Sequence, residues 1–188
     1  MIMKHINTII YTLSIILVSC NFSVKSDINQ ENLYSYDVET RLDSLNIVLR
    51  TPAKPVANFV KAVKTGNLIF LSGSGPKDVN GNYIKGKVGN DLTVAQGYET
   101  AKLIAIEQLS VLKAELGDLN KVVKIVKVLG MVNADSTFTQ HPEVINGFSD
   151  TMVQVFGERG KHARAAVGMA SLPRNIACEI EMVVEFRE

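Results

Sequence analysis

Two segments of the chain repeat apolar residues at the spacing of an amphipathic helix. The first begins at Thr93 and Gln96, which fit a capping box, and ends at Gly117, a common C-terminal stop. The second begins near Pro142, a favoured first helical position, and ends at the run GERG. Residues three and four apart share one helix face, so each repeat predicts one buried stripe. The stripes are Val94, Tyr98, Ala101, Ala105, Leu109, Leu112 and Leu116, and then Ile145, Phe148, Met152 and Val155.

The remaining apolar runs are strand-like. A hairpin is predicted where the turn KTGN lies between the strand-like runs ANFVKAV and NLIFLSG. A strand buried on both faces is predicted for the run KVVKIVKVLGMVN. Two more strands, 163–170 and 176–186, surround SLPRN, and residues 38–49 predict a short helix. The order after that helix is strand, strand, helix, strand, helix, strand, strand. It predicts an α+β fold whose helices cover one face of the sheet, leaving the other face to water or a partner.

The last two strands place charged and very small residues together. In the final strand Ile176, Cys178, Ile180, Met182, Val184 and Phe186 share an apolar face, and Glu179, Glu181 and Glu185 lie on the other. If Ala170 opposes Ala177 across the turn, the face of Glu179 also carries Arg164, Ala166 and Gly168. Most such strand charges are simply solvated. Alternatively, the small residues leave space for a ligand and a neighbouring subunit.

The N-terminus has the pattern of a targeting segment. Lys4 precedes an apolar run, Ile6 to Val18, that is shorter than the ~20 residues of a membrane span. LVSC then resembles a bacterial lipobox, which predicts a lipoprotein signal peptide over 1–19 and lipid on Cys20. An uncleaved anchor or a buried element is the alternative. We expect a polar tether over 20–37, one domain over 38–188, and an exported protein held on the membrane of the bacterial envelope by its lipid.

The charge, cysteine and histidine content of the chain limits the partners and metal sites to be expected. Without residues 1–19 the chain carries 19 basic and 19 acidic residues, so we expect no nucleic-acid partner. A basic patch around Lys77, Lys85 and Lys87 remains possible. Cys178, on an apolar strand face, is expected to pack as a small hydrophobe. The three histidines, His5, His141 and His162, have no metal-ligand spacing, so no metal is expected.

Three stretches together resemble the RidA (YjgF, endoribonuclease L-PSP) family. They are ARAAVGMASLPRNIACEIE, NLIFLSGSGP and EVINGFSDTMVQVFGE, and the resemblance covers residues 38–186. It implies a chorismate-mutase-like fold with two helices on one face of a mixed sheet. It also implies a homotrimer with a site at each subunit seam, hydrolysis of 2-imino or enamine acids to 2-oxo acids and ammonia, and no cofactor.

The resemblance also assigns roles. Arg164 would clamp the carboxylate of a small substrate, and Glu179 would position or activate water, with Glu181 as its rival. Asn146, Gly73 and the backbone N–H of Ala166 would line the pocket. Phe59 stands where the deaminases carry a tyrosine and is expected mainly to pack, with a contributory pocket role.

Two features depart from the family pattern. The first is a pair of long loops, PKDVNGNYIKGKVGNDLT and NADSTFTQHPE, which resemble those of a family subgroup whose substrate the sequence does not identify. The second is export, which is unexpected for an enzyme that removes cytosolic metabolites. The alternatives to deamination are a non-catalytic trimer that binds small carboxylates and, third, an endoribonuclease. His162 is expected to be an exposed strand-edge residue and His141 a helix-entry residue.

Overall fold

The computed structural model describes residues 32–188, which form one compact unit. This unit begins at Asn32, six residues before the domain start expected from the sequence. The signal peptide and Cys20 lie outside the described residues, and both stay predictions. Within residues 32–188 no helix has the length and apolar character needed to cross a membrane.

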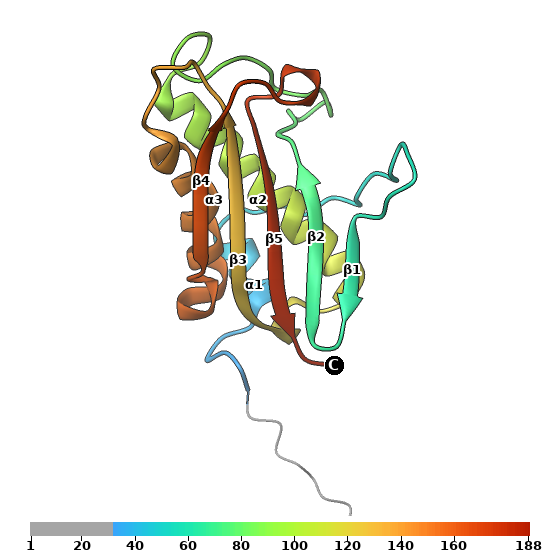
Figure 1. The fold of residues 1–188 in the computed structure, drawn as a ribbon. Coiled ribbons are helices and arrows are strands. Elements are labelled where there is room, and N and C mark those ends of the chain that lie inside the picture. Colours follow the sequence, from blue (N-terminus) through green and yellow to red (C-terminus); the bar gives the residue numbers. More distant parts are fainter. Residues whose placement is uncertain (1–31) are drawn as a thin grey trace, which may run out of the picture. The chain divides into compact units, whose positions relative to one another are not determined.

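A five-stranded mixed sheet lies against helices on one of its faces (Figure 1). The strand order is β1-β2-β5-β3-β4; β3 and β4 are parallel and the other pairs are antiparallel. The strands are β1 (Ala62–Thr65), β2 (Leu68–Ser74), β3 (Val122–Asn133), β4 (Ala163–Met169) and β5 (Cys178–Phe186). The helices are α1 (Val38–Ser44), α2 (Val94–Leu116) and α3 (His141–Phe156), with 3-10 turns η1 (Leu119–Lys121), η2 (Gly157–Gly160) and η3 (Pro173–Asn175). The predicted α+β fold is confirmed.

The two long helices follow their sequence signals. Thr93 and Gln96 form the predicted capping box, and Gly117 ends α2 in a left-handed conformation with φ of 74°. The predicted inner stripe of α3 is buried in full. α3 packs on α2 at Gly147, where an added Cβ would overlap the carbonyl oxygen of Tyr98.

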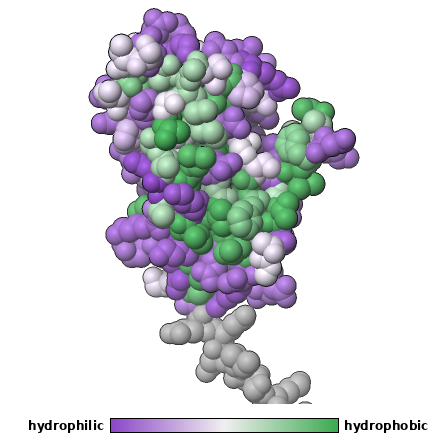
Figure 2. Space-filling view, in the orientation of Figure 1, coloured by the Kyte–Doolittle hydropathy of each residue, from purple (hydrophilic) through white to green (hydrophobic). Residues whose placement is uncertain are grey.

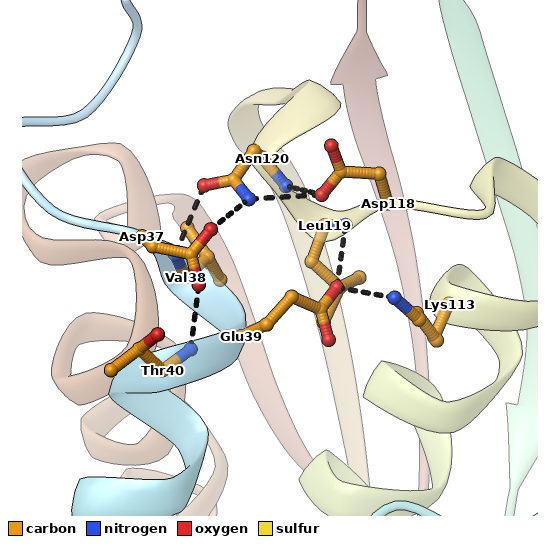
Figure 3. Close-up of polar contacts among 8 residues, drawn as sticks. All are labelled: Asp37, Val38, Glu39, Thr40, Lys113, Asp118, Leu119 and Asn120. Carbon is orange, nitrogen blue, oxygen red and sulfur yellow. Dashed lines mark hydrogen bonds and ion pairs between the residues drawn. The ribbon is translucent and has the colours of Figure 1, made fainter.

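A polar network fixes α1 to the rest of the fold (Figure 3). The Asn120 side chain accepts from the Val38 N–H at 3.0 Å and donates to Asp37 at 2.8 Å. Glu39 accepts from the Lys113 ammonium at 2.7 Å and from the Leu119 N–H at 3.1 Å. The bond from the Val38 N–H satisfies a free donor in the first turn of α1, and the others hold this short helix, which would be unstable alone, against α2 and η1.

The covered face of the sheet is the core, and the other face is open. All six apolar residues predicted for one face of the last strand are buried, including Cys178. The prediction that β3 is buried on both faces is wrong. Its burial alternates, and Lys124, Val126 and Lys127 are exposed, because no helix covers the second face.

The open face carries apolar side chains without a partner in this chain. Figure 1 looks onto this face, and Figure 2 shows hydrophobic residues gathered over its middle with hydrophilic residues along much of its rim. Val63 on β1, Phe70 on β2 and Val167 on β4 are exposed by 55, 45 and 40%. A monomer rarely exposes a large apolar patch, so this face is suited to an interface.

The two last strands are not neighbours, which overturns the pairing of Ala170 with Ala177. β3 lies between them, pairing with β4 in parallel and with β5 in antiparallel. Val128 of β3 pairs with both Arg164 and Met182. Paired residues point to the same side of a sheet, so Arg164 lies on the helix-covered face, like Met182, and Glu179 lies on the open one.

Candidate functional site

A β-bulge positions the candidate catalytic carboxylate. Leu71 pairs with Met182 and Ser74 pairs with Ile180, so two residues of β2, 72 and 73, oppose one residue of β5. A bulge leaves its extra residue out of the ladder and turns the strand locally. Gly73 therefore comes to lie directly against the side chain of Glu179: a Cβ on Gly73 would overlap Oε1 of that carboxylate. The resemblance placed both residues at one pocket; their roles there stay a prediction.

Gln108 of α2 holds the bulge from the helix side. Its buried Nε2 donates to the carbonyl of Ser72 at 3.0 Å and to the carbonyl of Ile180 at 2.9 Å. These two residues are the chain neighbours of Gly73 and Glu179. Because a buried carbonyl without a donor is costly, Gln108 stabilises the backbone on which the site is built. No local pattern in the sequence points to this role of Gln108.

The Glu179 carboxyl is half-buried on the open face. Partial desolvation, and secondarily the negative charge of Glu181, raises the pKa of Glu179 above its ordinary value. A carboxyl with a raised pKa exchanges protons closer to neutral pH than an exposed one does. Glu181 is exposed and two residues away on the same face. Burial thus distinguishes two carboxylates that strand alternation alone could not separate, and it favours Glu179, the one that the resemblance assigns.

A hollow of about 380 Å³ lies on the open face, and its carboxylate is Glu181, two residues along β5 from Glu179; Glu179 itself is not part of the lining. Lys127 pairs with Val183, and Leu129 pairs with Glu181, which makes Lys127 and Glu181 diagonal neighbours within reach of long side chains. The hollow thus offers a cation, a carboxylate and apolar walls in a space of small-molecule size. Its lining is Val63, Phe70, Leu71, Ser72, Lys127, Leu129, Glu181, Met182 and Val183.

We expect Gly73→Ala to impair the site while leaving the fold stable. The new methyl group would displace the Glu179 carboxylate, the mobile end of a side chain, without disturbing buried backbone. The expected loss of unfolding free energy is below about 1.5 kcal/mol, as for tolerated volume changes. Any activity that needs Glu179 should fall at least as much as in Glu179→Gln. If the double variant is much worse than Glu179→Gln, the glycine has another role.

The raised pKa of Glu179 should be visible in the pH dependence of the protein's stability. Its folded pKa is raised, so the ionised form is penalised in the folded state. This penalty is fully present above the folded pKa and disappears as pH falls through the folded pKa toward the unfolded value. We therefore expect Glu179→Gln to raise the melting temperature at pH 8, and the gain to vanish near pH 4. A gain that is equal at both pH values would contradict the raised pKa.

Arg164 and Asn146 form a second group, as predicted, but this group is on the opposite face from Glu179. Nη1 of Arg164 donates to Oδ1 of Asn146 at 2.8 Å and to Oγ of Ser149 at 3.0 Å, both on α3. The expectation that Arg164 and Glu179 share a surface is wrong for a single subunit. The reason is the position of β3 between their strands, which reverses the face assigned to β4.

The other predicted residues lie as follows. Ala166 is half-buried on the helix side and packs against the core. Phe59 precedes β1 and is 48% exposed, so its role at a pocket stays a prediction. Cys178 is buried, which raises the pKa of its thiol to about 12 and is consistent with simple packing. His141 is the first residue of α3, as expected for a helix-entry residue.

His162 differs from its expectation as an exposed residue. It is half-buried, and its ring contacts two groups: Ser149 Oγ lies 3.0 Å from Nε2, and the Gly160 carbonyl lies 2.7 Å from Nδ1. Sequence reasoning missed Ser149 entirely. Only the spacing of Asn146 and Ser149, three apart on one helix face, could have pointed to it.

Comparisons with known proteins agree with this fold. Residues 39–186 match the family model described as "YjgF/chorismate_mutase-like, putative endoribonuclease". Protein TCP17 of Trypanosoma cruzi is 40% identical over 149 residues, 79% of this chain and 93% of that protein. The crystal structure of Atu1372 from Agrobacterium tumefaciens, of unknown function, is 41% identical, with a TM-score of 0.73 over 80% of this chain and 94% of that one.

A further solved structure has the same architecture at lower identity. It is described as a "putative endoribonuclease" from Shewanella oneidensis MR-1, and it is 26% identical with a TM-score of 0.76. The alignment covers 80% of this chain and all of that one. The family model and these relatives span nearly the whole described unit, sheet and helices alike. This chain belongs to the YjgF/chorismate-mutase-like family.

Proposed function

We propose that the protein hydrolyses small 2-imino or enamine acids to 2-oxo acids and ammonia on the open face of the sheet, between Glu179 and the hollow lined by Lys127 and Glu181. The observation that carries the proposal is the half-buried Glu179 carboxyl, held against Gly73 and with a raised pKa. Proton transfer by one positioned carboxyl is the main requirement of imine hydrolysis. The family resemblance seen in the sequence supports the same reaction.

The proposed chemistry uses Glu179 as the acid/base and Lys127, in the neighbouring hollow, as the group that binds the substrate. Glu179 accepts a proton from water as the water oxygen attacks the imine carbon. Because the substrate enters as the protonated imine, this step gives a neutral carbinolamine. Glu179 then donates its proton to the carbinolamine nitrogen; as the C–N bond breaks the hydroxyl proton passes back to Glu179, ammonia leaves and a 2-oxo acid remains. The substrate carboxylate binds the Lys127 ammonium, and the apolar walls hold a short side chain. Arg164 has no part in this site within its own subunit, because it lies on the other face.

A homotrimer is part of the proposal. The support is the family membership and the apolar open face of the sheet, including Val63 and Phe70, which carries the hollow. Another subunit packed on this face would bury those side chains and enclose the hollow at a seam. A lower dielectric would then strengthen the interactions of Lys127 and Glu179 with a substrate. Light scattering after gel filtration of the full-length protein tests the trimer.

Lys127→Ala is expected to raise KM for 2-imino acids about tenfold or more, because the substrate loses one charge-assisted contact. The test is a coupled assay in which imines are generated from serine or threonine and the 2-oxo acid is measured. Lys124→Ala, on the same strand and also exposed, is the matched control and should retain the wild-type KM. Equal KM values for both variants would show that Lys127 does not bind the substrate carboxylate.

Binding of small carboxylates without turnover is the second candidate. The separation of Arg164 from Glu179 favours it, since within one subunit the guanidinium and the acid/base lie on opposite faces of the sheet and cannot act on one small molecule. Calorimetric titration with 2-oxobutanoate distinguishes the two functions. Binding with no turnover of any imine would establish the second and exclude the first.

A further inference from the structure

Gln108 is a buried polar side chain of α2 that reaches both strands at the β-bulge. It is fully buried, and its Nε2 donates to the Ser72 carbonyl of β2 and to the Ile180 carbonyl of β5. The register of these two strands shifts between Leu71 and Ser74, so the bonds lie where the ladder between the strands is interrupted. One amide therefore joins β2 to β5 at the point where their own pairing is irregular.

The amide is costly to bury at this position. Oε1 of Gln108 accepts no hydrogen bond from residues 32–188, and the buried Ser74 hydroxyl has no partner among these residues either. Ser74 pairs with Ile180, so its hydroxyl lies on the helix-covered face, the side from which Gln108 reaches the bulge. An unpaired buried polar atom destabilises a fold, and an apolar side chain at position 108 would avoid that loss. The two bonds donated by Nε2 are what the amide provides in return.

The two acceptor carbonyls belong to chain neighbours of the proposed acid/base site. Ser72 precedes Gly73, and Ile180 follows Glu179. A Cβ on Gly73 would overlap Oε1 of Glu179, so the carboxyl lies directly against the backbone of the bulge. A small change in the separation of β2 and β5 therefore changes both the position of this carboxyl and its exposure to water.

We propose that Gln108 is a positioning residue for the deamination: its two N–H bonds fix β2 against β5 at the bulge and thereby hold the Glu179 carboxyl half-buried, where it transfers protons to and from the substrate. This inference rests on the proposed function, because Gln108 acts only through Glu179. Gln108 is itself fully buried, so it touches no substrate. Without its bonds the carboxyl becomes more exposed, and the pKa of Glu179 falls toward that of a solvated glutamate.

Gln108→Met in the full-length protein tests the inference, because methionine keeps the length of the side chain and removes both donors. We expect kcat for 2-imino acids to fall about tenfold or more, since a misplaced catalytic group loses rate steeply. KM should stay within about threefold of wild type, because Lys127 is unchanged. The pKa of Glu179 should fall, as measured by carbon-13 NMR of labelled glutamate carboxyls, with Glu179→Gln used to assign the signal.

The NMR titration measures burial rather than a change of nearby charge. The charged neighbour that contributes to the raised pKa of Glu179 is Glu181, on the same face of β5, and it is unchanged in each variant. Met131, which pairs with Glu179 from β3, and the bulge residues Ser72 and Gly73 carry no charge.

Ser110→Ala is the matched control. Ser110 is another buried polar residue of α2, and its hydroxyl donates to the Ile106 carbonyl and accepts from the Arg50 N–H, so neither bond reaches the bulge. This variant should lose stability and keep the wild-type kcat and the wild-type pKa of Glu179. If Gln108→Met does not fold, Gln108→Asn replaces it, because it keeps the amide on a shorter side chain. Its kcat and pKa should then change in the same direction by smaller amounts.

A Glu179 pKa that is the same in the Gln108 variant and in Ser110→Ala would overturn the inference, and so would an unchanged kcat in an active enzyme. The titration needs no substrate, so it separates this inference from the proposed function. If the wild type turns over no imine while the pKa still falls in the Gln108 variant, deamination is contradicted and the positioning of Glu179 by Gln108 is supported.

Discussion

Glu179→Gln is expected to lower the turnover of 2-imino acids by about 100-fold or more, with KM changed much less. A glutamine has the shape of the glutamate but cannot accept or donate the proton that moves in the reaction, and general acid–base catalysis contributes about 10²–10⁴-fold. The side chain can still lie against Gly73, so substrate binding should persist. The coupled assay for 2-oxo acid measures both constants.

Glu181→Gln is the matched control for this result. It changes the same residue type on the same strand face, but at an exposed position. We expect kcat within about threefold of wild type, since loss of the Glu181 charge acts on Glu179 only through a secondary influence on the pKa. KM can change, because Glu181 lines the hollow beside Lys127. Equal losses in the two variants would show that the pair acts as one unit. A larger loss in Glu181→Gln would assign the proton transfer to Glu181.

Gly147→Ala is expected to lower the free energy of unfolding by more than about 2 kcal/mol. A Cβ at this position would overlap the Tyr98 carbonyl oxygen and approach the Lys102 nitrogen, which are backbone atoms of α2 that cannot rotate away. The two helices would have to separate, and overpacking of this kind costs about 1–3 kcal/mol or more. Equilibrium unfolding in urea, followed by circular dichroism, measures the change.

Gln154→Ala is the control for the helix-packing prediction. Gln154 is exposed on the same helix, so its substitution should change stability by less than about 0.5 kcal/mol. If Gly147→Ala is as stable as Gln154→Ala, the close approach of α2 and α3 is not needed for the fold.

Most of the fold could be predicted because its signals are local. The capping box at Thr93 and the stop at Gly117 set the bounds of α2, and alternation along β5 identified its buried face. The contact of Gly73 with Glu179 was predictable only through the family resemblance. The bulge that creates it needs a register shift between β2 and β5, which neither strand shows in its own residues.

The pairing of the last two strands could not be predicted from their alternation. The alternation of apolar and polar residues shows which residues share a face within one strand. It does not show which strand lies next to that strand, or which residues of the two strands point to the same side of the sheet. The run SLPRN has the composition of a hairpin turn, but it connects two strands, β4 and β5, that have β3 between them in the sheet. Because β3 lies there, Arg164 lies on the helix-covered side. The same non-local geometry brings Ser149 to His162, and it explains why their contact was missed.

The most direct test of the central claim is a crystal structure of the full-length protein with 2-oxobutanoate, the product of one candidate substrate. We expect its carboxylate within hydrogen-bonding distance of Nζ of Lys127, in the hollow of the open face, and its carbonyl carbon beside the Glu179 carboxyl. A carboxylate bound instead by Arg164 beside Asn146 would contradict this account and place substrate binding on the other side of the sheet.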